Sequence, residues 1–333
     1  MNNIKFQINN NPDIILKNLH YGISIPVLKE FEKYILKDIQ SANARSIILL
    51  DGDEILGHSL IFYQNNICYF GFFKVNNDDA ELIEILMNKI ISEAKELNMK
   101  QILGPINIPT IIFGWGFMKE GSKTSLSLAK PVNPPIYQEI FYKNGFNLKV
   151  EQLTWEGRLV RVNPYKNPRY NFDDYEVIFP NDRDHLMELK DIMLELHAKN
   201  LPPSARITPN IENSFENYAD FVLEFGDLYM FYFTRYKPAD KIVACGTAMP
   251  NIFIKDRNGN VKDLILYSWV VESEHRKKGL ITLMYYEMML RAKKDKYRTI
   301  SGPIATDNAE NTGVAQSHGL ITTRSHLILE LKL

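Results

Sequence analysis

Three consecutive cationic side chains precede a glycine in the second half of the chain. Arg276, Lys277 and Lys278 stand directly before Gly279, and an apolar run with helical spacing follows. The first turn of a helix presents unpaired backbone N–H groups and the positive end of the helix dipole. Because glycine lets an anion approach the backbone closely, this loop predicts a binding site for a phosphate or diphosphate group.

A strand and a helix must position this loop. Residues 264–271 form a β-branched and aromatic run, which predicts a buried strand. Leu280, Met284 and Met288 recur near helical spacing, which predicts a helix with one apolar face. The loop therefore leads from the end of a strand into a helix, the context in which such an anion site works.

The same order of elements occurs earlier in the chain. At an offset of 198 residues, Gly104-Pro105-Ile106 falls on Gly302-Pro303-Ile304. Residues 67–75 predict a strand that is again followed by a helix, and each half has a later helix that ends at a glycine, Gly145 or Gly319. Internal similarity of this kind indicates two copies of one mixed α/β unit.

The repeat predicts the division of the chain. We expect residues 1–161 to form an N-terminal lobe, residues 162–174 a linker and residues 175–333 a C-terminal lobe. At the constant offset, Asp78 and Glu81 of the first lobe take the places of the first cation and the glycine of the loop. Carboxylates would repel a diphosphate, so we expect the anion site in the C-terminal lobe only.

The loop resembles that of the GNAT superfamily of acyl-CoA N-acyltransferases. The pattern of that family after its central strand is R/Q-x-x-G-x-G/A. Arg276 and Gly279 match it, whereas Ile281 stands where the family has a small residue. The resemblance covers residues 175–333 and, more weakly, the order of elements in the first half.

The family pattern continues downstream as N-x6-Y-x3-G-F. Asn308 and Gly319 match it, whereas Ala315 and Leu320 replace the tyrosine and the phenylalanine. The resemblance implies two GNAT-like lobes in tandem, an α+β fold with central, mixed but mostly antiparallel sheets flanked by helices. It also implies transfer of an acetyl or other short acyl group from acyl-CoA to an amine of a small molecule or peptide.

The resemblance further implies which residues contact the acyl-CoA. Backbone N–H groups at the end of the central strand would hold the thioester carbonyl, and the loop amides would hold the diphosphate. The implied cofactor-binding residues are Val270, Val271, Arg276, Lys277, Lys278, Gly279, Leu280, Ile281 and Asn308.

The proton-transfer groups have several candidates. Glu272 at the strand end could accept the proton of the amine, directly or through water, or it could simply balance the cations of the loop. His318 has a suitable intrinsic pKa, although a histidine at a helix end is often structural. Because Ala315 cannot protonate a thiolate, Ser317, Tyr285 or solvent would have to replace the missing tyrosine.

Composition excludes several other classes. The chain has 333 residues, with Lys+Arg 39 against Asp+Glu 40 and a net charge of -1, and its cations form no stripe along the sequence. We therefore expect no nucleic-acid partner. No apolar run is long enough for a membrane helix and no signal peptide is recognisable, so we expect no membrane partner and a cytoplasmic protein. Cys68 and Cys245 lie in apolar runs, and the spacings of a metal site are absent.

Three alternatives stay open. Ile281 and Ala315 also fit a non-catalytic CoA-binding or interaction protein. A transferase that uses aminoacyl-tRNA as donor could pair GNAT-like lobes, and it would need a basic groove instead of a diphosphate loop. An NAD or ATP enzyme could use the same anion site, but it lacks the acidic or Lys-Ser/Thr residues that accompany such sites.

Overall fold

A computed structural model describes residues 4–22, 25–121, 127–160, 162–205, 209 and 214–333 of the chain. The chain divides into two compact units, each discontinuous in sequence. Unit 1 comprises Met1–Gln152, Thr208–Asn217 and Arg324–Leu333, and unit 2 comprises Leu153–Ile207 and Tyr218–Thr323. The last ten residues therefore group with the N-terminal unit, whereas the sequence predicted a C-terminal lobe that extends to residue 333.

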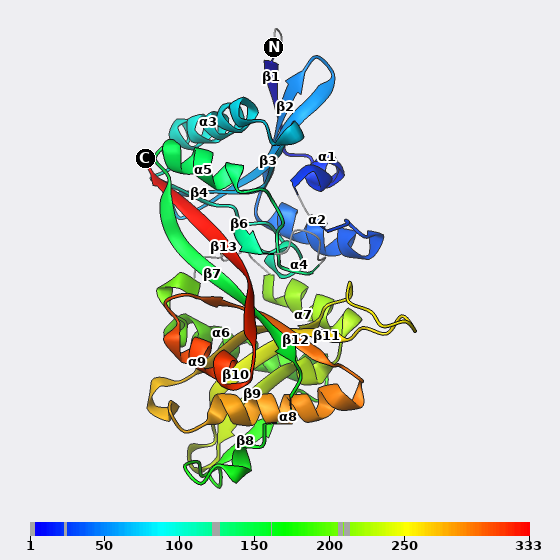
Figure 1. Cartoon of the computed structure of the whole chain (residues 1–333), viewed down its shortest axis with the longest axis vertical. Coiled ribbons are helices and arrows are strands. Elements are labelled where there is room, and N and C mark those ends of the chain that lie inside the picture. Colours follow the sequence, from blue (N-terminus) through cyan, green and yellow to red (C-terminus); the bar gives the residue numbers. More distant parts are fainter. Residues whose placement is uncertain (1–3, 23–24, 122–126, 161, 206–208, 210–213) are drawn as a thin grey trace. The chain divides into compact units, whose positions relative to one another are not determined.

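Unit 1 is built mainly from the first half of the chain (Figure 1). Its elements are β1 (Ile4–Asn9), α1 (Pro12–Asn18), α2 (Glu32–Ser41), β2 (Arg45–Asp51), β3 (Glu54–Gln64), β4 (Ile67–Val75), α3 (Ala80–Glu96), β5 (Gln101–Gly104), α4 (Thr110–Phe113), β6 (Phe117–Gly121) and α5 (Ile136–Lys143). The strand order is β1-β2-β3-β4-β5-β13, and β6 also pairs with β13. The β4–β5 ladder is parallel. The β1–β2, β2–β3, β3–β4, β5–β13 and β6–β13 ladders are antiparallel.

Unit 2 repeats this order of elements. Its elements are β8 (Tyr175–Ile178), α6 (Arg183–Asn200), α7 (Ser214–Phe225, of which the part from Tyr218 belongs to this unit), β9 (Phe231–Tyr236), β10 (Lys241–Pro250), β11 (Asp263–Val271), α8 (Leu280–Lys294), β12 (Thr299–Ala305) and α9 (Ala309–Ser317). The strand order is β7-β12-β11-β10-β9-β8, in which β11–β12 is parallel. The predicted mixed α/β class with flanking helices is confirmed.

Two long strands belong to both units. β7 (Asn147–Arg158) begins in unit 1 and ends in unit 2, whereas β13 (Ile321–Lys332) begins in unit 2 and ends in unit 1. In unit 1, Leu329 of β13 pairs with Gly104 of β5. A boundary drawn from the repeat alone misses this exchange, because the hydrophobic pattern of a strand does not reveal its partner.

Local sequence signals explain the ends of several elements. Asn147 and Ile321 each follow a helix that ends at a glycine with positive φ, Gly145 at 88° and Gly319 at 72°. Both glycines were predicted to end helices, and a left-handed conformation is least strained there for a residue without a Cβ atom. Asp79 caps α3, because its side chain accepts from the backbone N–H groups at the start of that helix.

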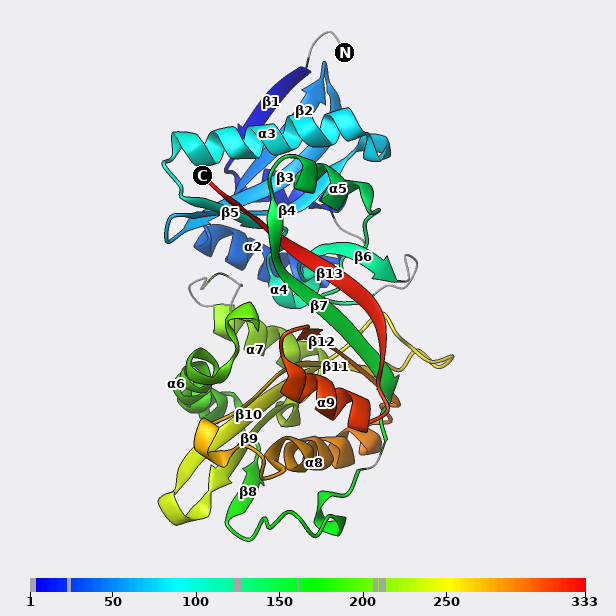
Figure 2. The ribbon, with the colours of Figure 1, turned by 60° about the vertical axis from the view of Figure 1, so that its left-hand side comes forward.

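Each unit has helices on both faces of its sheet (Figure 2). In unit 2 the two faces can be assigned from adjacent residues of β11: Ser268 contacts His197 of α6, and Trp269 contacts Tyr285 of α8. Successive side chains of a strand point to opposite faces, so α6 and α8 cover opposite faces of the sheet. This arrangement places the predicted loop, between β11 and α8, at one end of the sheet.

Candidate functional site

The central strands of unit 2 lie side by side for only part of their length. The β11–β12 ladder covers three residue pairs and its last pair is Ile265–Ser301, although β11 continues to Val271 and β12 to Ala305. At Gly302 the chain is so close to the Leu266 carbonyl that an added Cβ would lie 2.7 Å from its oxygen. Beyond this contact the two strands part and leave backbone groups of β11 without a ladder partner on that side.

The direction of these backbone groups follows from the opposite neighbour, β10. Glu272 N donates to Val243 O over 2.8 Å, which continues the register that pairs Val271 with Ala244. Residues of an antiparallel ladder alternate between pairs that exchange hydrogen bonds and pairs that do not. Val270 therefore points its amide toward β10, whereas Trp269 and Val271 point their amides toward the parted side.

The two residues that were expected to hold the thioester carbonyl therefore differ in direction. The amide of Val271 faces the parted side, the amide of Val270 faces β10, and the amide of Trp269 lies on the same side as that of Val271. The alternation of a strand puts residues two apart on the same side, so a pair of adjacent residues cannot both face one opening.

Arg276 holds the beginning of the loop in place. Its Nε donates to the Val271 carbonyl over 3.2 Å and its Nη2 donates to the Asn200 carbonyl over 3.3 Å. The guanidinium thus ties the end of β11 to the end of α6 and is itself half-buried. The predicted cofactor ligand is engaged with the protein's own backbone in this structure.

The rest of the loop has the geometry of an anion site. Lys277 has φ of 62° and Gly279, the residue before α8, has φ of 79°. Gly279 has no side chain that could cap α8, so the N-cap residue itself supplies no acceptor to the first amide groups of that helix. Lys277 and Lys278 are exposed and Leu280 is buried in the core. Loop backbone and lysine ammonium groups could therefore contact one anion together.

An aromatic ring covers the glycine of this loop. A Cβ atom added to Gly279 would lie 2.7 Å from Cδ2 of Tyr170. Tyr170 comes from the segment before β8, and its ring is itself only half-buried. The ring requires glycine at this position as much as the positive φ does, and it forms one wall of the loop.

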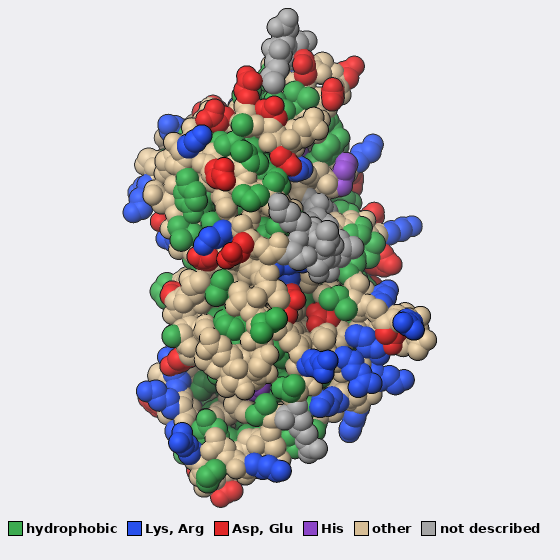
Figure 3. All heavy atoms as spheres, viewed as in Figure 1, with side chains coloured by type: hydrophobic (Ala, Val, Ile, Leu, Met, Phe, Trp, Pro, Cys, Tyr) green, Lys and Arg blue, Asp and Glu red, His purple; other side chains and the backbone are tan. Residues whose placement is uncertain are grey.

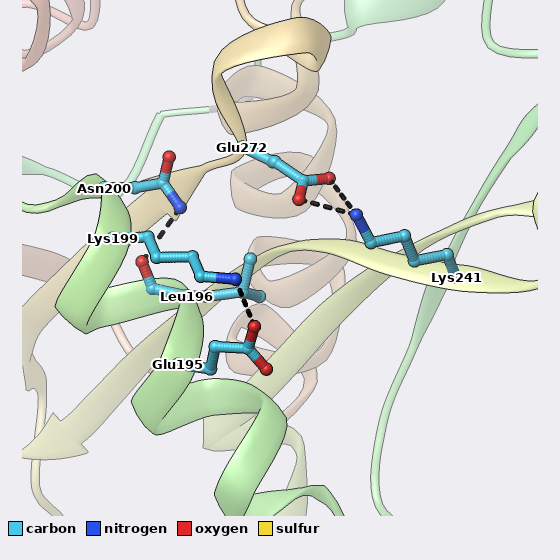
Figure 4. A network of polar contacts seen from close by, with 6 residues as sticks. All are labelled: Glu195, Leu196, Lys199, Asn200, Lys241 and Glu272. Atoms are coloured by element: carbon cyan, nitrogen blue, oxygen red, sulfur yellow. Dashed lines mark hydrogen bonds and ion pairs between the residues drawn. The ribbon is translucent and has the colours of Figure 1, made fainter.

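Glu272 forms an ion pair (Figure 4). Its two carboxylate oxygens accept from Lys241 Nζ over 2.6 and 2.8 Å. On the neighbouring helix α6, Lys199 turns its ammonium group to Glu195. Both carboxylate oxygens thus contact one ammonium group, which favours the charge-balancing interpretation of Glu272 over a role as base.

Tyr285 and Ser317 were the other predicted catalytic residues. The Tyr285 hydroxyl is fully buried and donates to the Val160 carbonyl over 3.0 Å. The Ser317 hydroxyl donates to the Val314 carbonyl over 2.8 Å. His318 lies against the Tyr285 ring at 4.7 Å between centroids, with its Nδ1 2.7 Å from the Val314 carbonyl. All three side chains are bound to nearby backbone of unit 2.

Asn308 has a structural contact as well. Its side-chain oxygen accepts from Asn311 N over 3.2 Å and so caps α9. Ile281 follows Leu280 in the first turn of α8 and is half-buried. The structure therefore places the loop residues around one helix start, and Asn308 at the start of the next helix.

A polar pair that the sequence analysis missed lies on the α6 face of the parted stretch. Ser268 Oγ is 2.8 Å from His197 Nε2, and Cys245 Sγ is 3.9 Å from the same nitrogen. Burial lowers the pKa of His197 to about 4 and raises the pKa of the Cys245 thiol, so both groups are uncharged at neutral pH. Helical spacing alone gave no sign that His197 meets a serine of β11.

Unit 1 has the same parting of strands, filled by its own side chains. The parallel β4–β5 ladder also covers three pairs, the last being Tyr69–Leu103. On the parted side Phe72 N donates to Asn107 Oδ1 over 2.6 Å, and Val75 N donates to the Tyr137 hydroxyl over 3.2 Å. These contacts satisfy backbone groups that would otherwise be buried without partners.

The structure also corrects the equivalence between the two loops. Asp79 and Gly279 are the residues that directly precede α3 and α8, so they correspond, in place of the Glu81–Gly279 match given by the constant offset. The connection from β11 to α8 is longer than that from β4 to α3, which a gap-free alignment cannot represent. The first turn of α3 is nevertheless acidic, as predicted, with Glu81 beside the capping Asp79.

Known structures with a similar fold extend over the whole chain. A tandem GNAT protein from the clavulanic acid biosynthesis pathway aligns with a TM-score of 0.61 and 11% identity, and the alignment covers 99% of this chain and 98% of that one. The chain has the tandem GNAT fold. This confirms the expected resemblance for both halves, although the identity is too low to carry over an activity.

Two further structures agree on the GNAT fold. A GCN5-related glucosamine N-acetyltransferase region of a fungal multi-domain β-N-acetylglucosaminidase aligns with a TM-score of 0.64 and 13% identity over 98% of this chain and 38% of that one. A GCN5-related N-acetyltransferase from Sphaerobacter thermophilus aligns with a TM-score of 0.57 and 8% identity over 98% and 95%. No family model and no curated protein sequence matches the chain.

Among the helices that the structure describes, none has the length and apolar composition needed to cross a membrane.

Proposed function

We propose that this protein transfers an acetyl or other short acyl group from acyl-CoA to an amine of a small molecule or peptide, and that unit 2 carries the reaction. The observation that supports this most strongly is the parting of β11 from β12 directly before the uncapped start of α8. A diphosphate at Gly279 and a thioester beside Val271 would then belong to one extended molecule that lies along the opening.

The backbone of β11 would stabilise the reaction. When the amine attacks the thioester carbon, a C–N bond forms, the C–S bond breaks and negative charge develops on the carbonyl oxygen. The amides of Trp269 and Val271 face the side where this oxygen would lie and could donate to it. The amine would pass its proton to solvent, because burial lowers the pKa of His197, the partner of Ser268 on the α6 face, to about 4 and so makes this histidine a weak base.

Unit 1 would serve as a scaffold in this proposal. Asn107 and Tyr137 occupy the backbone groups that correspond to the opening of unit 2. An acyl-CoA could bind there only if both side chains moved away. The Phe72 and Val75 amides would then lose their hydrogen-bond acceptors, and this loss costs free energy. We therefore propose one acyl-CoA per chain.

Calorimetric titration tests the cofactor. We expect acetyl-CoA and CoA to bind with a stoichiometry of one, and NAD and ATP to bind much more weakly. At a hundred times its dissociation constant, such a ligand should stabilise the fold by about 2.7 kcal/mol. If no CoA species binds or stabilises the protein at millimolar concentration, the proposal is wrong.

A pair of glycine variants locates the site. Gly279→Ala places a methyl group against the Tyr170 ring at a φ of 79° and should weaken CoA binding at least tenfold. Gly259→Ala is the matched control, because Gly259 has φ of 81° with nothing within 4 Å of the added atom. Both variants strain the backbone similarly, but only Gly279→Ala should alter the titration.

A measurement of acetyl-CoA turnover distinguishes an acyltransferase from a second candidate function, that of a CoA-binding protein without catalysis. The contacts of Tyr285 with Val160 and of Ser317 with Val314 favour that candidate, since neither hydroxyl is free to protonate a thiolate. We expect thiol release from acetyl-CoA that depends on an added amine. Tight binding without such release from any amine of a broad panel would support the binding protein instead.

A further inference from the structure

A second charged surface lies at the opposite end of α8 from the candidate site. Three segments meet there through backbone hydrogen bonds: Arg298 N donates to Lys262 O over 2.8 Å, and Leu159 N donates to Arg298 O over 2.8 Å. Lys262 N in turn donates to Ile254 O over 3.0 Å. The end of β7, the hairpin before β11 and the turn after α8 therefore form one continuous surface of unit 2.

This surface carries cations from all three segments. We call it the basic surface, and its exposed members are Arg158, Lys255, Arg257, Lys293, Lys294, Lys296 and Arg298. Among the residues that the structure describes, none of these seven forms an ion pair. Figure 3 shows Lys and Arg side chains gathered over the end of α8 and the neighbouring hairpin.

The acidic residues of these segments are already engaged. Asp256 binds Lys262 over 3.0 Å and also accepts from the backbone of its own hairpin, contacts that hold its pKa at about 2. Asp295 lies beside Tyr229, and burial and then this carboxylate raise the pKa of the Tyr229 hydroxyl. Neither carboxylate is directed to the seven cations, so their charge is open to an external partner.

The clustering of seven cations on the basic surface is electrostatically unfavourable for the isolated protein. Like charges repel one another, and the chain as a whole has a net charge of only -1. The helix dipole accounts for Lys293 and Lys294, which lie in the last turn of α8, but not for Arg158 or Arg257 on other segments. Cations from three separate segments indicate a surface that binds a polyanion.

We propose that the basic surface binds the phosphodiester backbone of a nucleic acid. Composition and the absence of a basic stripe along the sequence had predicted no such partner, because the cations come from three segments that meet only in the fold. A nucleic acid presents a row of phosphates, which suits exposed cations spread over three segments. An acidic protein would usually require aromatic or apolar anchors, and among the described residues of these segments the large exposed apolar side chains are only Val160 and Ile254.

An anionic membrane fits this surface less well. Peripheral helices insert an apolar face into the lipid. The apolar face of α8, including Leu283, Met284 and Met288, is buried in unit 2. The helix can therefore offer only its charged end to an external partner.

Binding of labelled RNA and DNA duplexes of mixed sequence tests the proposal. We expect fluorescence anisotropy to give an affinity that falls steeply with salt, with a logarithmic slope of roughly -3 to -5 for about four to five phosphate contacts. The triple variant Lys293→Glu, Lys294→Glu, Lys296→Glu should bind at least tenfold more weakly. Its circular dichroism and its calorimetric titration with CoA should match the wild-type protein.

A second triple variant is the matched control for net charge. Lys29, Lys95 and Lys100 are exposed lysines of unit 1, and their replacement by glutamate changes the charge by the same amount. This control should bind nucleic acid nearly as well as the wild-type protein. If both triple variants lose the same affinity, or if neither duplex binds at low salt, the proposal is overturned.

Two further probes test whether the basic surface binds a different kind of polyanion. Polyglutamate that binds as tightly as the duplexes would assign the surface to an acidic protein, and vesicles rich in phosphatidylserine that do so would assign it to a membrane. Either result would overturn the nucleic-acid proposal. Because CoA titration is measured on the same variants, failure here is distinguishable from failure of the proposed acyl transfer.

Discussion

Replacement of Arg276 by alanine should loosen the end of β11 more than it removes a cofactor contact. The guanidinium makes two hydrogen bonds, to Val271 O at 3.2 Å and to Asn200 O at 3.3 Å. A hydrogen bond to a charged group contributes about 1.5–3 kcal/mol. Both contacts are long and the side chain is half-buried, so we take the low end and expect a total loss of about 2 kcal/mol, after allowance for solvent.

A loss of this size is measurable in unit 2. About 2 kcal/mol lowers the folding equilibrium constant by roughly thirtyfold and the melting temperature by about 4–8 °C for a domain of this size. Urea denaturation gives the global value, and hydrogen exchange of the amides between Glu272 and Gly279 gives the local one. The exchange of these amides should accelerate in Arg276→Ala before the rest of unit 2 is affected.

Lys277→Ala is the control for charge at the same loop. Lys277 is exposed and its removal should change the stability by less than about 0.5 kcal/mol, while it weakens CoA binding moderately and in a salt-dependent manner. If Arg276→Ala keeps wild-type stability and loop exchange but loses CoA affinity, the guanidinium does not hold the loop. Arg276 would then be a direct ligand of the diphosphate, as the family resemblance implies.

Three other perturbations test separate parts of the molecule. Burial raises the pKa of Asp38 from 3.8 to about 7, so this carboxyl contributes stability below pH 3.8 that is lost as the pH rises through 7. Asp38→Asn should remove this slope from urea denaturation measured between about pH 4 and pH 8. Tyr137→Phe leaves the Val75 amide without its acceptor and should destabilise unit 1 by about 1–3 kcal/mol, measured by urea denaturation, without a change in CoA binding. Ser268→Ala should leave both kcat for acyl transfer and the dissociation constant of CoA unchanged in steady-state kinetics and calorimetric titration, because it removes only the partner of His197, a buried and weak base.

Much of the fold followed from local pattern. The strands at 67–75 and 264–271 and the helix ends at Gly145 and Gly319 were predicted close to their observed positions, because each depends on residues near in sequence. The exchange of β7 and β13 between the units was not predicted. It depends on which strand edges meet, and that pairing is set by contacts distant in sequence.

The candidate site likewise has features that the local sequence predicts and features that depend on distant segments. The loop from Arg276 to Gly279 was predicted from adjacent residues, and the structure places it at the start of a helix. The contact of Tyr170 with Gly279 and that of His197 with Ser268 join segments far apart in the chain, so no local motif could indicate them. The predicted acid and base side chains were chosen by proximity in sequence, which does not determine where a side chain points.

The two units show how one backbone geometry can lead to two outcomes. A pair of parallel strands that parts exposes N–H groups, and a buried N–H group must find an acceptor. In unit 1 the acceptors are Asn107 and Tyr137, which close the opening from within. In unit 2 the corresponding amides of Trp269 and Val271 have no ladder partner on that side, and the neighbouring helix begins with an uncapped glycine. A ligand whose oxygen atoms reached the same positions in unit 2 would accept hydrogen bonds like those that Asn107 and Tyr137 accept in unit 1.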